Sequence, residues 1–279
     1  MTRTNSATNY GQYNLAVDGA SELVFETSTG GPFWTDPQSK LQKPERGYIL
    51  TKTHCGGRCD ICAPKTYVES QYSFLKHCLE TSYISKNKDG EAVVSVGSYD
   101  KDLVARIIHL IRDPFDNIVS RFHLRHNRFI KLNDTESLEK YPKSREGFRA
   151  YCNDLSEMDV NEEKTYKSYQ DIFDSITTVP CHADFFRYIQ WHNLAFNTAC
   201  DLQIPSLVIH YENYTTNFDQ TMDAIVDFLQ LNAIHEAPSF IPGKTYRDYF
   251  TGEEFEAVTV MFEKLALGKT WDNTKHYFE

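Results

Sequence analysis

Two short runs of branched apolar residues stand out along the chain. Residues 104–111 read Val-Ala-Arg-Ile-Ile-His-Leu-Ile, and residues 205–212 read Pro-Ser-Leu-Val-Ile-His-Tyr-Glu. Near-continuous apolar runs of this length are typical of strands buried on both faces of a parallel sheet. A third short strand is predicted at residues 47–52, directly before Thr53 and His54.

Helices are predicted between and after these strands. They are expected over about 67–79, 113–129, 181–200, 217–229 and 252–267. The order strand, helix, strand, helix indicates an α/β fold with a central parallel sheet flanked by helices on both faces.

Two polar regions interrupt this pattern. Residues 1–46 are weakly periodic and rich in Gly, Ser, Thr, Asn and Pro, which predicts an irregular N-terminal segment. Residues 133–180 are rich in Lys, Glu and Tyr, which indicates short helices and loops on the substrate side. We therefore expect one α/β domain over 47–279, with a helical and loop insertion around 133–180.

Composition excludes some classes of protein. The 279 residues suit one large domain, and the net charge of −10 argues against nucleic-acid or anionic-membrane partners. No apolar run reaches the length of about eighteen residues that a transmembrane helix requires, and the N-terminus lacks the apolar core of a signal peptide. Either the protein is soluble as written, or an upstream targeting segment is missing.

One segment is basic despite the acidic balance of the chain. Between residues 112 and 131 the only acids are Asp113 and Asp116, whereas the bases are Arg112, Arg121, Arg125, Arg128 and Lys131, with His123 and His126. The segment forms either a solvated basic helix face or a local anion site.

The start of this segment favours the anion site. Asp113 and Pro114 are suited to the N-cap and first position of a helix that follows the strand ending at Ile111. Ligands bind at the carboxyl ends of parallel strands, and helix N-termini attract phosphate. Arg112 and the hydroxyl of Ser120 can together hold a phosphate dianion. The alternative is a structural arginine at a sheet edge.

Residues 106–122 resemble the 3′-phosphate-binding signature of sulfotransferases that use 3′-phosphoadenosine 5′-phosphosulfate (PAPS). This signature is an apolar strand, Arg-Asn/Asp-Pro, a following Asp and a Ser on the helix. The resemblance assigns the 3′-phosphate to Arg112 and Ser120. It also implies a three-layer sandwich like that of P-loop nucleotide transferases, with PAPS as the donor and no metal requirement.

Lys52-Thr53-His54 is similar to a second segment of the same family. There the histidine removes the proton of the acceptor hydroxyl, and the lysine lies close to the transferring sulfuryl group. A neutral imidazole suits this task near neutral pH, and a cation stabilises the developing charge. Without the resemblance, a lone histidine at a strand end is more often structural.

Two later stretches agree with the resemblance. Gln190-Trp191-His192 and residues 208–214 resemble a helix and a strand end of the family. Residues 243–251 resemble the loop that closes over the nucleotide, which makes Lys244 and Arg247 candidates for binding the 3′-phosphate.

The sequence departs from the family in its 5′-phosphosulfate loop, which is expected upstream of His54. Residues 28–34 are weakly similar to that loop, but they lack its Lys or Arg, and Pro32 disrupts the required helix start. The chain is therefore an N-terminally incomplete sulfotransferase or a catalytically inactive, nucleotide-binding relative.

The seven cysteines include Cys55, Cys59, Cys62 and Cys78 near His54. These four could form disulfides in a secretory lumen, bind a structural zinc or remain free thiols. Two sequons, at Asn133 and Asn213, are compatible with glycosylation in such a lumen.

The leading hypothesis is a PAPS-dependent sulfotransferase that acts on an acceptor hydroxyl. A carbohydrate is expected if the cysteines and sequons mark a Golgi lumen; a small alcohol, a phenol or a protein tyrosine are alternatives. Outside such a lumen the location would be cytoplasmic. A kinase-like P-loop phosphotransferase is a further class, but the chain lacks the Gly-x4-Gly-Lys-Ser/Thr loop.

Overall fold

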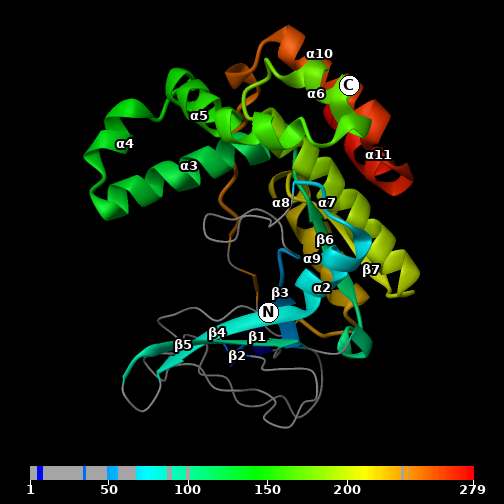
Figure 1. The fold of residues 1–279 in the computed structure, drawn as a ribbon. Coiled ribbons are helices and arrows are strands. Elements are labelled where there is room, and N and C mark those ends of the chain that lie inside the picture. Colours follow the sequence, from blue (N-terminus) through cyan, green and yellow to red (C-terminus); the bar gives the residue numbers. More distant parts are fainter. Residues whose placement is uncertain are drawn as a thin grey trace.

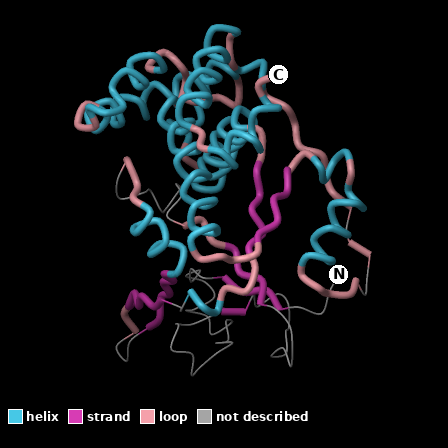
Figure 2. The backbone as a smooth tube through the Cα atoms, turned by 90° about the vertical axis from the view of Figure 1, so that its right-hand side faces the viewer, coloured by secondary structure: helices cyan, strands magenta, loops and turns pink. Residues whose placement is uncertain are grey.

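The computed structural model describes residues 5–8, 34–35, 49–55, 67–86, 90–98, 101–233, 236–237 and 239–279. Within these ranges the molecule is mostly helical, with three small sheets. Most helices gather at one end, two of the sheets lie at the other, and the third sheet joins the two ends (Figures 1 and 2).

The two apolar runs form the joining sheet. Strands β6 (Ile107–Ile111) and β7 (Ser206–His210) pair in parallel from Ile107 opposite Ser206 to Ile111 opposite His210. The prediction of two parallel strands is confirmed. Burial alternates along β6, however, because Ile111 is fully buried whereas Leu110 is half exposed. The apolar run therefore does not make a strand that is buried on both faces.

The expected single central sheet is not present among the described residues. Strand β3 (Ile49–Lys52) pairs instead with β1 (Asn5–Thr8) in parallel, and β1 pairs with β2 (Trp34–Thr35). Strands β4 (Glu80–Lys86) and β5 (Ala92–Ser98) form a separate antiparallel sheet. The first 46 residues thus contribute two strands that the sequence did not predict, because strands of four and two residues are too short to show an alternating pattern.

The helices carry most of the core. They are α2 (Gln71–Leu79), α3 (Pro114–Leu132), α4 (Thr135–Lys140), α5 (Arg145–Glu163), α6 (Gln170–Ile176), α7 (His182–Asp201), α8 (Asn213–Thr216), α9 (Phe218–Phe228), α10 (Gly252–Leu265) and α11 (Gly268–Thr274). Each predicted helix is found, with boundaries that shift by a few residues. Phenylalanines from α3, α5, α6, α7 and α10 form the centre of the core.

The predicted insertion is more regular than expected. It contains α4, α6 and the 19-residue helix α5. A disulfide between Cys152 and Cys181 joins α5 to the residue before α7. This covalent link fixes the insertion against the core.

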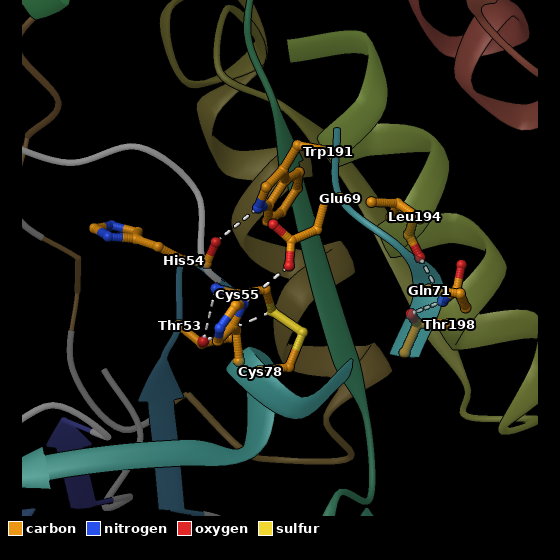
Figure 3. Close-up of a disulfide and its surroundings, with 10 residues drawn as sticks. Thr53, His54, Cys55, Glu69, Gln71, Cys78, Trp191, Leu194 and Thr198 are labelled. Carbon is orange, nitrogen blue, oxygen red and sulfur yellow. Dashed lines mark hydrogen bonds and ion pairs between the residues drawn. A yellow bond between two sulfur atoms is a disulfide. The ribbon is translucent and has the colours of Figure 1, made fainter. Parts of the chain in front are cut away.

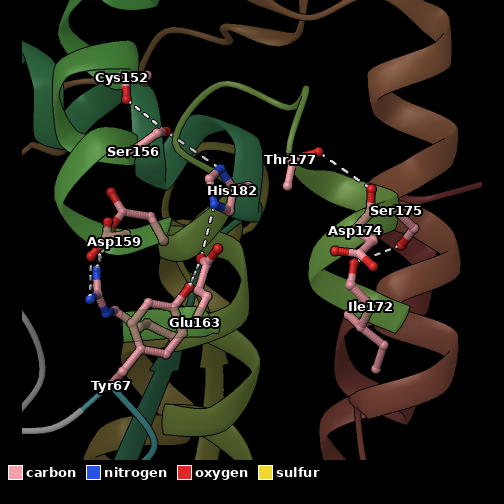
Figure 4. Close-up of polar contacts among 12 residues, drawn as sticks. Tyr67, Cys152, Ser156, Asp159, Glu163, Ile172, Asp174, Ser175, Thr177 and His182 are labelled. Atoms are coloured by element: carbon pink, nitrogen blue, oxygen red, sulfur yellow. Dashed lines mark hydrogen bonds and ion pairs between the residues drawn. The ribbon is translucent and has the colours of Figure 1, made fainter. Parts of the chain in front are cut away.

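A buried polar network joins the segment before α2 to the same helices (Figure 4). The Tyr67 hydroxyl donates to Glu163, and His182 Nε2 lies 2.9 Å from the same carboxylate oxygen. Arg187 packs over the Tyr67 ring and binds Asp159 at 2.8 Å. Burial and the neighbouring Glu163 raise the pKa of Tyr67, so its hydroxyl stays protonated and continues to donate.

Candidate active site

The turn between β6 and α3 has the predicted local structure. Asp113 is the N-cap of α3, and its carboxylate accepts from the backbone N–H groups of Phe115 at 2.8 Å and Asp116 at 3.3 Å. Pro114 occupies the first position, which needs no N–H donor. The Asp113 N–H donates to Glu212 Oε1 at 2.9 Å. The carboxyl ends of β6 and β7 are therefore tied together.

Arg112 is positioned by aromatic side chains at this turn. Its guanidinium lies 4.5 Å from the centre of the Tyr211 ring, and its carbonyl accepts from the Tyr188 hydroxyl at 2.7 Å. The buried Nε has no hydrogen-bond partner among the described residues. A buried charged donor without an acceptor is costly, so this arginine fits an anionic ligand oxygen.

The loop before α10 lies against this arginine. A Cβ atom on Gly243 would lie 3.1 Å from Tyr211 and 3.6 Å from Arg112 Nη2, so glycine permits the close approach of the backbone. The Tyr246 N–H donates to Asp116 at 2.6 Å. The loop resemblance thus falls on residues that do contact the β6–α3 turn.

The two basic candidates of this loop differ in their surroundings. Lys244 is exposed and lies near enough to His123 to affect its ionisation. Arg247 instead binds the Asp113 carboxylate at 3.0 and 3.2 Å and donates to the Tyr277 carbonyl. The guanidinium of Arg247 is therefore already engaged within the protein.

One face of α3 looks toward this loop. Asp116, Ser120 and His123 share that face by their helical spacing. The His123 ring lies 4.7 Å from that of Tyr246, between centroids, whereas the partly exposed Ser120 has no hydrogen-bond partner among the described residues. The serine hydroxyl is thus available on the same face as the loop contacts.

Two titratable groups on this face, His123 and Asp116, have shifted pKa values. The pKa of His123 is lowered to about 4 by burial and by Lys143, His126 and Lys244. The pKa of Asp116 is raised to about 6 by burial and by Asp113, against the opposing effects of the Tyr246 N–H and Arg112. The imidazole of His123 is therefore neutral near neutral pH, and the Asp116 carboxyl protonates more readily than a free aspartic acid.

A cavity of about 260 Å³ lies beside an adjacent face of α3. Its lining combines residues of α3 and α7 with the segment around His54, and includes His54, Glu69, Phe74, Asn117, Arg121, Asp184, Tyr188 and Trp191. Arg121 and Asp184 form an ion pair of 3.1 Å. Arg112 and Ser120 are not among the residues that line this cavity, so the structure does not bring them together with His54 in one cavity.

His54 is held through its backbone. Its carbonyl accepts from Trp191 Nε1 at 2.7 Å, and the imidazole points away from that tryptophan (Figure 3). The next residue, Cys55, forms a disulfide with Cys78 on α2. Lys52, the last residue of β3, precedes His54 by two positions.

Cys55 and Cys78 form a disulfide. Of the three alternatives for these two cysteines, the disulfide therefore holds, and their sulfurs are neither zinc ligands nor free thiols. Cys59 and Cys62 lie outside the described residues, as do residues 28–33 of the segment that resembles the 5′-phosphosulfate loop.

Within the ranges that the structure describes, no group of three or more His, Cys, Asp or Glu side chains is arranged to hold a metal ion. No described helix is long and apolar enough to cross a bilayer.

Sequence reasoning missed three residues that organise the site. Glu212 and Tyr211 lie in a stretch noted only for its general resemblance, and their contacts with Asp113 and Arg112 span about a hundred positions. Tyr277, which binds Arg247 and Glu212, belongs to no recognisable motif.

Comparison with known families gives one match. Residues 98–249 match the model of the sulfotransferase domain, a stretch that runs from the end of β5 to Tyr249 and contains Arg112, Ser120 and the loop at Gly243. The search of curated proteins and the search of solved structures found no match. Because the matched residues make up more than half of the chain, it belongs to the sulfotransferase domain family.

Proposed function

We propose that the protein transfers a sulfuryl group from PAPS to a hydroxyl of a carbohydrate acceptor. Membership of the family supports sulfuryl transfer in general. The observation that carries the choice of donor is the Arg112 guanidinium, which lies beside Gly243 and the Ser120 face of α3. Its buried Nε has no hydrogen-bond partner in the part of the chain that the structure describes.

In this proposal the 3′-phosphate of the donor binds between α3 and the loop at residues 243–249. Arg112 supplies charged N–H donors and Ser120 a hydroxyl. Lys244 approaches from the loop, where its effect on His123 indicates a shared electrostatic environment. Arg247, also a candidate, contributes to the same site from its position on Asp113.

His54 acts as the general base and Lys52 stabilises the transferring group. The acceptor hydroxyl loses its proton to the imidazole while its oxygen bonds to sulfur. The bond between sulfur and the bridging phosphate oxygen breaks, and adenosine 3′,5′-bisphosphate leaves with those electrons. A cation near the bridging oxygen lowers the cost of this charge. No metal is needed for these steps.

The cavity beside His54 supports a sugar as the acceptor. It combines aromatic walls, including Phe74 and Trp191, with hydrogen-bonding groups such as Glu69 and the Arg121–Asp184 pair. Aromatic surfaces with a few placed polar groups are typical of sites for small organic ligands. An alcohol, a phenol or a tyrosine would use fewer of these polar groups.

Two broader proposals accompany this function. Two disulfides within the described residues and the sequons at Asn133 and Asn213 favour an oxidising secretory compartment such as the Golgi lumen. We also propose the three-layer sandwich of P-loop nucleotide transferases, on the basis of membership of the sulfotransferase domain family. Within the described residues, β3 and the β6–β7 pair lie in separate sheets.

The proposal is tested by incubating the protein with PAPS and a panel of glycans, phenols and tyrosine peptides, and detecting sulfated products by mass spectrometry. Calorimetry with adenosine 3′,5′-bisphosphate and with ATP runs in parallel. We expect sulfated glycans and binding of the bisphosphate without magnesium. Bisphosphate binding without any product would indicate an inactive relative. Preference for ATP with magnesium would indicate a phosphotransferase and overturn the proposal.

A further inference from the structure

Four residues from distant parts of the chain form a closed ring of hydrogen bonds beneath Arg112. Arg247 Nη2 binds Asp113 Oδ2 at 3.0 Å and also donates to the Tyr277 carbonyl. The Tyr277 hydroxyl donates to Glu212 Oε2 at 2.8 Å, and Glu212 Oε1 accepts from the Asp113 N–H at 2.9 Å. The ring therefore returns to the residue where it began.

The ring joins four separate elements. Asp113 lies at the β6–α3 turn and Glu212 just after β7. Arg247 begins the 3₁₀ turn η4 (Arg247–Tyr249), and Tyr277 ends the 3₁₀ turn η5 (Lys275–Tyr277). Tyr277 and Asp113 each take part through both the backbone and the side chain. The Tyr277 ring is buried in a small core cluster with Ile111 and Phe196, so its position is fixed by packing.

All four carboxylate oxygens of the ring have donors. Asp113 Oδ1 accepts from the first turn of α3 and Oδ2 from Arg247, while the Glu212 oxygens accept from Asp113 and Tyr277. A carboxylate whose oxygens already accept hydrogen bonds competes less for a neighbouring guanidinium. Within the described residues, Arg112 Nε is left without a partner, although these acids lie close by.

We infer that Tyr277 is a positioning residue for the donor nucleotide, an inference that rests on the proposed function. Tyr277 does not touch the nucleotide. It holds Arg247, and with it the loop that carries Gly243, Lys244 and Tyr246, against the β6–α3 turn. It also occupies the Glu212 oxygen that would otherwise lack a donor. Both effects keep the Arg112 guanidinium open to the 3′-phosphate.

The test is Tyr277→Phe, which keeps the buried ring and the carbonyl that binds Arg247. It removes the hydroxyl that donates to Glu212 and that also lies 2.9 Å from His210 Nδ1. Affinities for adenosine 3′,5′-bisphosphate and adenosine 5′-monophosphate are measured by calorimetry. We expect about a 5–20-fold loss for the bisphosphate, which is smaller than the direct loss of a hydrogen bond to a charged group because Tyr277 acts through Glu212. The monophosphate affinity should change by less than about 2-fold. Glu212→Gln is the second variant if Tyr277→Phe does not fold, and it should show the same selective loss.

Tyr141→Phe is the matched control, because the Tyr141 hydroxyl also donates to a carboxylate, that of Asp154. A merely structural role for Tyr277 predicts equal losses for both ligands, or the same loss in the control. Either result, or an unchanged bisphosphate affinity in the Tyr277 variant, would overturn the inference. Failure of the unsubstituted protein to bind the bisphosphate would instead remove the proposed function.

Discussion

The two strand ends that carry the proposed chemistry are held in different ways. At the end of β6, Arg112 and Asp113 are fixed by hydrogen bonds and an ion pair from Tyr188, Glu212 and Arg247. At the end of β3, the His54 carbonyl accepts a hydrogen bond from Trp191, and the next residue, Cys55, is fixed by a disulfide.

We expect the two strand ends to have different roles, with the β6 end setting nucleotide affinity and the β3 end setting the position of the base. A polar network with many charges can set the affinity for an anionic nucleotide, because each member alters the field at the phosphate. A disulfide on the next residue and a hydrogen bond to the His54 carbonyl fix the main chain that carries the proposed base. Substitutions at the two strand ends should therefore affect different steps.

The largest effect is expected from His54→Ala. The general base is lost, so the transfer rate should fall by about 10²–10⁴-fold. Affinity for adenosine 3′,5′-bisphosphate, measured by calorimetry on the same preparation, should stay nearly unchanged because the phosphate site lies at the other strand end. Equal losses of rate and affinity would remove the assignment of the base.

Arg112→Ala should weaken binding of the bisphosphate by about 2–5 kcal/mol, the range found when one partner of a desolvated charge pair is removed. Arg145→Ala is the control, since Arg145 is an exposed arginine at the start of α5. The affinity of both variants for the bisphosphate is measured by calorimetry. An affinity that matches the control would count against the phosphate site.

Removal of the Cys55–Cys78 disulfide by double substitution to serine should act on the other strand end. The bond closes a separation of 23 residues, so its loss should lower the free energy of unfolding by about 3 kcal/mol. The transfer rate should fall with it, whereas bisphosphate affinity should not. Cys200→Ser, at the exposed free cysteine, is the control for denaturant unfolding and activity. A parallel loss of affinity would mean that the two strand ends are not independent.

The smallest effect is expected from Asp116→Asn. The folded state raises the pKa of this carboxyl from 3.8 to about 6, so the folded protein binds more protons than the unfolded chain between these values. The unsubstituted protein should therefore lose stability as pH rises from about 4 to 6, and the variant should not. Above pH 7 the variant should be more stable by about 1–2 kcal/mol, as followed by thermal unfolding across pH. A difference in stability between the two proteins that stays constant at all pH values would show that it does not come from the raised pKa of Asp116.

The β6 end was largely predictable from sequence because its structure is local. A branched apolar strand, an Asp N-cap and a Pro at the first helical position all lie within ten residues and specify the turn between them. The ring of contacts that completes it was not predictable. Arg247 and Asp113 are 134 positions apart and Tyr277 and Glu212 are 65 apart, and no local preference selects such partners.

Other features of the structure were not predicted from the sequence. The pairing of β1 with β3 and the Cys152–Cys181 disulfide depend on tertiary packing. Helix α5 was expected as shorter pieces because its polar composition hides a buried face that includes Phe148 and Cys152. Strand β6 is apolar in sequence but not buried throughout, since its apolar residues include the half-exposed Leu110.

The central claim is that Arg112 recognises the 3′-phosphate. It is tested most directly by a thermodynamic cycle that measures adenosine 3′,5′-bisphosphate and adenosine 5′-monophosphate against the unsubstituted protein and Arg112→Ala. We predict that the unsubstituted protein prefers the bisphosphate and that the variant loses most of this preference. A variant that keeps the full preference would show that the 3′-phosphate binds elsewhere.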